Sequence, residues 1–337
     1  MPKLYFSRQI ISVLQLIRNN SPYTVIILLI FTLLAKMQVL VHPHLPLAEG
    51  QALLFKYLVS VLDVVMRGSA FGYTLVAVAM VFAQALYINA IAARHRLFAK
   101  TTYIPAFLYL LFTSLHPSFS YFSTGLVLNW CLLGAIDILL RFHQTSHPRK
   151  DVFNAGFLLS LMALLHFQAL FFVVLLIVAL VLLRSFNAGE WVVTLLGYLT
   201  PIYFWVCILF LADNLSYFSQ WPQVHLFFPD RFHAPLYLTG FLTGIIVLLS
   251  CGMYALQGLM AKTSVFTRRN WVVMLISLAL SVITGMMSNI IKPYIWVLII
   301  PALTLIISHA LYMEKNKRFS NFAFYFSLLL LVFCQLA

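Results

Sequence analysis

Charged residues, and acidic residues above all, are scarce in this sequence. Only 9% of its 337 residues are charged and only eight are Asp or Glu, whereas ordinary soluble domains contain roughly 25% charged residues. Hydrophobic residues make up 63% of the chain, which is more apolar surface than a soluble fold can bury. The composition therefore excludes an ordinary soluble domain and indicates a protein that lies largely in lipid.

Motifs of the common enzyme classes are also missing. The sequence has no serine hydrolase, phosphate-loop or dinucleotide-binding signature, and no cleavable-signal pattern near its first residue. Its four cysteines all fall inside apolar runs, which excludes a disulfide framework and a thiolate metal site. The net charge of +13 comes from short Lys and Arg clusters between those runs, a distribution that indicates membrane topology rather than nucleic-acid binding.

What the sequence does contain is a series of long apolar runs. Lipid admits only helices or closed barrels, because unpaired backbone groups are costly there, and runs without strand-like alternation favour helices. We therefore predict an all-α polytopic bundle that forms a single transmembrane domain over 1–337, with about eleven spans. The predicted spans lie at 22–41, 71–92, 101–116, 122–141, 153–167, 168–186, 190–212, 235–258, 270–288, 293–312 and 320–336.

Three segments outside these spans differ in character. The N-terminal residues 1–20 contain a short amphipathic stretch, 4–17, which we interpret as an interfacial helix. Residues 42–70 form a long loop whose central stretch is too short and polar to span, so a surface helix is predicted there. Residues 213–234 form the second long loop.

Lys and Arg divide unequally between the two sides of the predicted spans. Sixteen of the 21 fall on the side that carries residues 1–20, and five fall on the other. Because positive residues accumulate on the cytoplasmic side, we expect a cytoplasmic N-terminus and cytoplasmic loops at 94–100, 142–151 and 262–270. The loops at 42–70 and 213–234 are then expected on the outer side.

Most of the few acids have an ordinary explanation in the sequence. Asp137 lies one turn before Arg141, and we expect the two to pair. The acids among the cytoplasmic basic clusters are expected to be solvated loop charges; they are Asp151, Glu190 and Glu314.

Glu49 differs, because it lies in the first outer loop just ahead of the predicted surface helix. A partly desolvated carboxylate at the bilayer edge can act as a general base or hold a divalent metal. The alternative is a first-turn acid that stabilises the helix dipole by about 0.3–1 kcal/mol. Glu49 is therefore the candidate catalytic residue, with the structural alternative open.

Two further groups of outer-side residues are candidates for binding. His42 and His44 flank a proline close to Glu49, a pattern that fits a divalent-metal site or, alternatively, interfacial histidines without a ligand. Arg231 and Lys292 are outer-side cations near apolar helix ends, and each either binds a lipid phosphate or extends to the headgroups without a specific ligand. His166 is predicted at the same face, where a protonated imidazole can bind a phosphate.

The order of elements up to about residue 210 resembles that of the GT-C class of membrane glycosyltransferases, which use polyprenyl-phosphate donors. In that class an acid in the first outer loop precedes a surface helix, and Glu49 followed by 52–58 stands in the matching place. The segment 154–166 resembles the glycine-led hairpin of the class, and Gly197 and Pro201 stand where its next helix often has Gly and Pro. The resemblance implies a GT-C-like arrangement in the first two thirds of the chain.

The sequence also departs from that pattern. The class usually has a second acid at the outer start of the fourth span, whereas 123–129 offers only Asn129, and the large outer domain of many members is missing. The whole chain is similar to an uncharacterised family of bacterial multi-pass inner-membrane proteins, a similarity that implies no activity.

Three functions from different classes remain. The first is a glycosyltransferase-like enzyme that acts on a polyprenyl-phosphate-linked sugar at the outer face of the inner membrane, with Glu49 as the general base. Membrane lipid is an expected partner. The second is a transporter or flippase of a lipid or small amphiphile, which the near absence of charges within the spans disfavours. The third is a non-enzymatic assembly subunit. Nucleic acid is not an expected partner, and a divalent metal is the one cofactor that the residues suggest.

Overall fold

The structure, a computed structural model, describes residues 13–18, 21–46, 52–143, 148–184, 186–217, 236–261, 263–288, 293–313 and 317–336. Every regular element in these ranges is helical, as predicted. In chain order the elements are α1 (Val13–Arg18), α2 (Pro22–Ala35), α3 (Met37–Val41), α4 (Leu53–Met66), α5 (Ala70–Arg94), α6 (Ile104–Thr113), η1 (Pro117–Ser120), α7 (Thr124–Leu140), α8 (Pro148–Leu165), η2 (Phe167–Phe172), α9 (Val173–Leu183), α10 (Ala188–Leu211), α12 (Leu236–Met260), α13 (Val265–Met287), η3 (Pro293–Ile299), α14 (Ile300–Tyr312) and α15 (Lys317–Leu336).

Six of the described helical segments are long and apolar enough to cross a membrane. They are α5, α10, most of α12, α13, α15 and the unit that η3 and α14 form together. Four further apolar segments have only 10–17 residues, and they are most of α2 and the whole of α6, α7 and the η2–α9 unit. Length and composition therefore support a multi-pass protein with six candidate spanning helices among the described residues, and these criteria do not confirm the predicted number of about eleven.

The first predicted span is a broken helix. Pro22 lies in the first turn of α2, and Ser21 has the extended backbone of a helix cap, although its side chain makes no capping bond. The helix breaks at Lys36, whose φ of −108° and ψ of 13° separate α2 from the five residues of α3. The break places the side chain of this lysine against α6 and η1.

The predicted surface helix is present as α4 and is amphipathic. Phe55 and Val59 are buried against the bundle, whereas Val61, Val64 and Val65 are exposed. Left-handed residues at Arg67 and Gly68 (φ 50° and 70°) end α4, and the side chain of Ser69 then caps α5. A helix of this shape packs on protein with one face and presents apolar side chains with another.

The predicted interfacial helix lies mostly outside the described residues. Its last part is α1, which packs into the bundle through Leu14 and Ile17, both almost fully buried. The amide of Tyr103 donates to the carbonyl of Ile17 at 3.1 Å. This described part of the N-terminal segment therefore belongs to the packed bundle.

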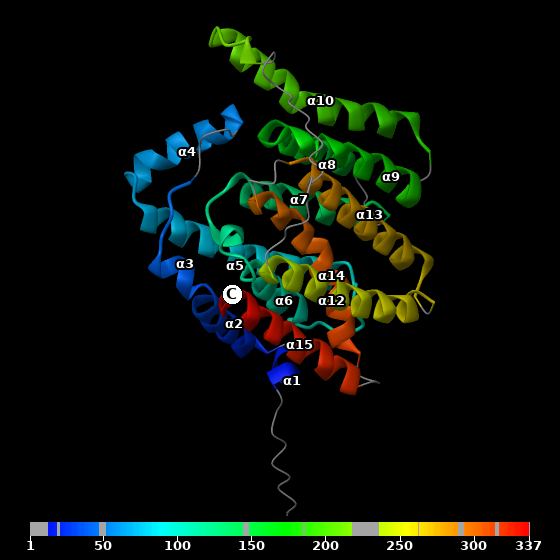
Figure 1. The fold of residues 1–337 in the computed structure, drawn as a ribbon. Coiled ribbons are helices and arrows are strands. Elements are labelled where there is room, and N and C mark those ends of the chain that lie inside the picture. The colour runs from blue at the N-terminus through cyan, green and yellow to red at the C-terminus, as the bar shows by residue number, and fades with distance from the viewer. Residues whose placement is uncertain are drawn as a thin grey trace, which may run out of the picture.

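The η3–α14 unit forms the centre of the molecule, where 89% of its span is buried. The helices lie side by side across the molecule, with α10 at one margin and α2 and α15 at the other (Figure 1). Close approach to the central unit depends on glycine. A Cβ on Gly125 of α7 would lie 2.1 Å from the carbonyl oxygen of Tyr294, and one on Gly252 of α12 would lie 2.8 Å from that of Ile306.

The bundle has two chemically different ends. At the first, which we call the basic end, lie the described parts of the connections that follow α5, α7, α9, α12 and α14, which are 95–103, 141–143, 184, 186–187, 261, 263–264 and 313. Contacts that join this end include Phe98 stacked on His309 of α14, Arg184 bound to the carbonyl of Phe142 and Arg269 of α13 bound to the carbonyl of Leu182 in α9. The described members of the Lys and Arg clusters assigned to the cytoplasm from the sequence fall at this end.

At the second end, which we call the histidine end, lie the described histidines His42, His44, His116 and His166. The 113–124 connection meets α3 and α5 here, and the ring of Tyr73 packs on Phe122. Gln335, near the end of α15, donates to the carbonyl of Ala35 at 2.8 Å. Two ends with different residues agree with the alternation of loops predicted from charge.

Candidate functional site at the histidine end

A buried lysine is the most unusual feature of the histidine end. Lys36 is only 1% exposed. Its ammonium donates to the hydroxyl of Ser120 at 2.6 Å, to that of Thr113 at 3.2 Å and to the carbonyl of Thr113 at 3.3 Å. All three donors of the ammonium therefore have acceptors on α6 and η1.

No described carboxylate forms a salt bridge with Lys36. Burial of a charge without an opposite charge is costly, so an ionisable residue inside a membrane protein is by default a candidate functional residue. From the sequence, Lys36 is one of the five Lys and Arg residues expected on the outer side, with no role assigned to it. The signal that could have singled it out is its place as the one Lys or Arg within the first apolar run.

One of the two histidines predicted to bind metal contacts the residue that follows Ser120. The ring of His44 packs on Tyr121, with 4.5 Å between the ring centroids, and both His42 and His44 are exposed. Burial raises the pKa of the Tyr121 phenol, so this group remains protonated and can donate a hydrogen bond. The described residues contain no group of three metal-ligating side chains, and Glu49 lies outside them, so the metal site remains a prediction.

His166 is brought to the end of α13. It lies at the break between α8 and η2, and its Nε2 is 2.8 Å from the hydroxyl of Ser288. The other two predicted phosphate-binding residues, Arg231 and Lys292, lie outside the described residues. Ser288 precedes Lys292 by four positions in the sequence. His166 therefore contacts the residue at the end of α13 from which the chain continues to Lys292.

Aromatic side chains join α4 to α10 at this end. Tyr57 of α4 makes an edge contact with Trp205 of α10, with 6.3 Å between ring centroids. The hydroxyl of Tyr217 accepts a hydrogen bond from the amide of Leu53 at 3.1 Å, at the start of α4. The first turn of α4, which follows the candidate acid in sequence, is therefore held close to the last part of α10.

Asn129, the residue found where the resemblance calls for a second acid, is closed inside the bundle. Its amide donates to the hydroxyl of Tyr109 at 2.6 Å, which donates to Gln84 at 2.6 Å. Gln84 in turn donates to the carbonyl of Leu126 at 2.9 Å. All three side chains have no exposed surface, so Asn129 links α5, α6 and α7 and does not line an outer opening.

The acids at the basic end are engaged in structural pairs. Asp137, 4% exposed, forms a salt bridge with Arg94 and lies 2.8 Å from Nε2 of His95, so its predicted partner Arg141 does not pair with it. The prediction that Glu190 is a solvated charge is also wrong. It is 5% exposed and accepts two hydrogen bonds from Arg184, at 3.0 and 2.5 Å.

The two glycines that the resemblance singled out meet at a helix crossing. A Cβ on Gly197 of α10 would lie 2.5 Å from the carbonyl oxygen of Phe153, and one on Gly156 of α8 would lie 3.0 Å from that of Thr194. Pro201 lies one turn further along α10, inside the helix. This crossing is the most extensive helix pair of the described bundle.

Comparison with known proteins gives one match. No curated protein and no solved structure shows significant similarity to the chain. A family model described as a family of unknown function, DUF6427, matches residues 51–337. The matched region begins at the start of α4 and runs through α15, while Lys36, His42, His44 and Glu49 precede it. Because the match covers most of the chain, the protein belongs to this family of unknown function, DUF6427.

Proposed function

We propose that the protein is a membrane glycosyltransferase that takes a sugar from a polyprenyl-phosphate donor at the histidine end. The observation that carries the proposal is α4, an amphipathic helix directly after the loop that contains Glu49. Its exposed valines can rest in the membrane surface while its buried face packs on the bundle. That placement is the one in which the GT-C class, which the sequence resembles, uses its acid.

We further propose the arrangement that this function needs. Eleven spans would place the histidine end outside the bacterial inner membrane, with a cytoplasmic N-terminus. The proposal is supported by the coincidence of each predicted span with a helical segment or a helix pair, and by the gathering of basic side chains at the opposite end. The shorter helices, such as α6 with ten residues, would then lie within the bundle rather than in contact with lipid across its full thickness.

In this proposal Glu49 removes the proton of the acceptor hydroxyl, and cations hold the donor phosphate. Arg231 and Lys292 would supply charge-assisted hydrogen bonds to the phosphate. His166, fixed by Ser288, would donate from its imidazole. A divalent metal between His42, His44 and Glu49 is an addition that the exposed position of both histidines permits.

The test compares Glu49→Gln with wild type in sugar transfer from a lipid-linked donor, using the full chain in reconstituted membranes. Glutamine keeps the size of the side chain but cannot accept a proton, so the rate should fall by about 10²–10⁴-fold with folding preserved. Glu314→Gln, the same change in the 313–317 connection, is the matched control. An unimpaired Glu49→Gln enzyme would contradict the catalytic role.

A transporter or flippase is the second candidate, and the helix breaks favour it. Discontinuous spanning helices are typical of transporters, and here α2 breaks at Lys36, while η2 and η3 precede α9 and α14 as 3₁₀ segments. Translocation of a fluorescent polyprenyl-phosphate analogue in proteoliposomes, without any transfer product, would favour this function over the enzyme.

A further inference from the structure

Buried polar side chains lie along α5, between the two ends of the bundle. This helix runs from the histidine end to the basic end and packs against both α6 and α7 (Figure 1). The side chains fall into three groups, around Asp137 at the basic end, Tyr109 in the middle and Lys36 at the histidine end, which together we call the polar file. In a chain that is 63% hydrophobic, buried polar groups of this kind indicate function.

The group at the basic end is centred on the carboxylate of Asp137 in α7. It accepts a hydrogen bond from Arg94 and one from the hydroxyl of Tyr87 at 3.3 Å. It also lies 2.8 Å from Nε2 of His95. The side chain of Arg94 is 48% exposed, so solvent reaches the outer part of this group.

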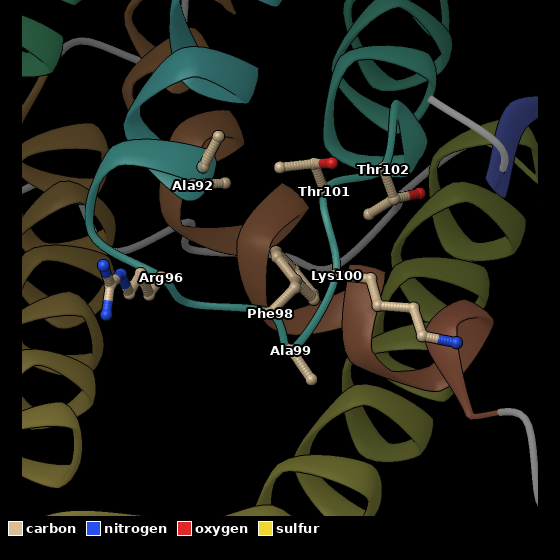
Figure 2. A pocket seen from close by; sticks show the side chains of 8 residues that line it. Ala92, Arg96, Phe98, Ala99, Lys100, Thr101 and Thr102 are labelled. Carbon is tan, nitrogen blue, oxygen red and sulfur yellow. The ribbon is translucent and has the colours of Figure 1, made fainter. Parts of the chain in front are cut away.

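A cavity of about 480 Å³ begins where α5 ends. Its lining includes Ala93 and Arg96, which flank Arg94 and His95 in the sequence. Figure 2 shows this stretch of chain as it turns from α5 towards α6, with the side chains of Arg96 and Lys100 directed away from each other. A space of this volume admits water, so water reaches the chain on both sides of His95.

The middle group joins three helices. Asn129 of α7 donates to the hydroxyl of Tyr109 in α6 at 2.6 Å, and that hydroxyl donates to Gln84 of α5 at 2.6 Å. Gln84 precedes Tyr87 by three positions, and residues three apart on a helix are neighbours on its surface. Oδ1 of Asn129 is buried and has no hydrogen-bond partner among the described residues, so it is an acceptor for water within the file.

The group at the histidine end is the Lys36 cluster. The ammonium donates to the hydroxyls of Thr113 and Ser120, and Thr113 follows Tyr109 by four positions on α6. Residues four apart lie on one face of a helix, separated by about 6 Å along its axis. A single water molecule can bridge polar groups at such a separation.

The chemistry of the file differs from that of polar residues that only hold helices together. Small polar side chains suffice for helix association in a membrane, whereas this file has a buried ammonium at one end and a carboxylate with an imidazole at the other. Hydroxyl and phenol groups, which both donate and accept hydrogen bonds, stand between them. Such series of ionisable residues within a membrane protein are typical of proton relays.

We propose that the polar file is a proton pathway between the two ends of the bundle. One proton is taken up at one end and another is released at the opposite end, by transfer among Lys36, hydroxyl groups, the phenol of Tyr109, water and the pair of Asp137 and His95. No group is oxidised or reduced, and the electrochemical gradient sets the direction. The pathway is separate from the proposed transferase, since it uses neither Glu49 nor the residues assigned to the donor phosphate.

The experiment measures proton flux into liposomes that contain the full chain. A potassium diffusion potential set with valinomycin drives protons inward, and pyranine inside the liposomes reports the pH. Tyr109→Phe removes the central hydroxyl with little change of shape, and Lys36→Met removes the charge at the histidine end. The matched control is Tyr198→Phe in α10, where the phenol oxygen is also buried but lies outside the file.

We expect wild-type protein to raise the flux about tenfold or more above that of empty liposomes. Tyr109→Phe and Lys36→Met should each lower this protein-dependent flux by about tenfold or more, and Tyr198→Phe should stay within about twofold of wild type. A wild-type flux equal to that of empty liposomes would overturn the proposal. So would an unchanged flux in Tyr109→Phe, or an equal loss in Tyr198→Phe, because the latter would indicate a general effect on packing.

Discussion

At the residue scale, Lys36 shows how a charge is kept inside this bundle. Its ammonium reaches three oxygen acceptors of α6 and η1, which offset part of the cost of burial. Replacement of a buried charge by an apolar side chain of similar length is often neutral or stabilising. Truncation of the same side chain leaves a cavity, and such changes cost about 2–5 kcal/mol.

We therefore expect the free energy of unfolding of Lys36→Met to be within about 1 kcal/mol of the wild-type value. That of Lys36→Ala should be lower than wild type by about 2–5 kcal/mol. Chemical denaturation in detergent, followed by Trp fluorescence, measures both. If Lys36→Met were as unstable as Lys36→Ala, the hydrogen bonds of the ammonium rather than the packing of its stem would carry the stability.

At the scale of elements, the crossing of α8 and α10 depends on the absence of a side chain at Gly197. A Cβ there would lie 2.5 Å from the carbonyl oxygen of Phe153, which is backbone and cannot move without shifting the helix. Gly197→Ala should therefore cost about 1–3 kcal/mol of stability. The matched control is Gly258→Ala in α12, where no atom lies within 4 Å.

For the control we expect a gain of about 0.4–1 kcal/mol, because alanine lowers the conformational entropy of the unfolded chain. The two variants are compared by thermal unfolding in the same detergent. A Gly197→Ala protein as stable as Gly258→Ala would mean that the two helices separate readily and that the crossing is not close-packed in solution.

At the scale of the whole molecule, the two ends should lie on opposite sides of the membrane. In a chain without its native cysteines, single cysteines are placed at exposed positions: Ala99 and Val265 at the basic end, and Leu45 at the histidine end. Leu97, in the same connection as Ala99, is unsuitable for labelling because only 2% of it is exposed. With an impermeant maleimide, position 45 should react in intact cells, and positions 99 and 265 only after the membrane is opened. Reaction of position 265 in intact cells would contradict this orientation and indicate the opposite one.

Much of the fold can be predicted from the sequence because lipid offers the backbone no hydrogen-bond partners. Each spanning segment must therefore pair its own N–H and C=O groups. Apolar runs therefore predict helices, and the polar content of 53–66 identifies α4 as a helix apart from the spans. The number of spans could not be obtained in this way. Apolar runs in α6 and α7 are shorter than the membrane is thick, and they are buried by neighbouring helices.

The candidate site was predicted only in part. Composition and spacing placed His42, His44 and His166 at one end, but the partners of these residues come from distant segments. The contact of His44 with Tyr121 and that of His166 with Ser288 each join helices that no local pattern links. Lys36 was missed as a site residue for the same reason, since its acceptors lie 77 and 84 positions away.

By itself the sequence determined the helical class, the alternation of basic and histidine-bearing loops and the amphipathic α4, because each depends on residues near in the chain. Only the tertiary structure decided which charges pair. Asp137 lies four residues from Arg141, yet it pairs with Arg94 and His95 of α5. A helical side chain leans toward the N-terminus of its helix, and α5 packs there against α7. The direction of a side chain and the helix that meets it are properties of the packed bundle, which sequence spacing does not contain.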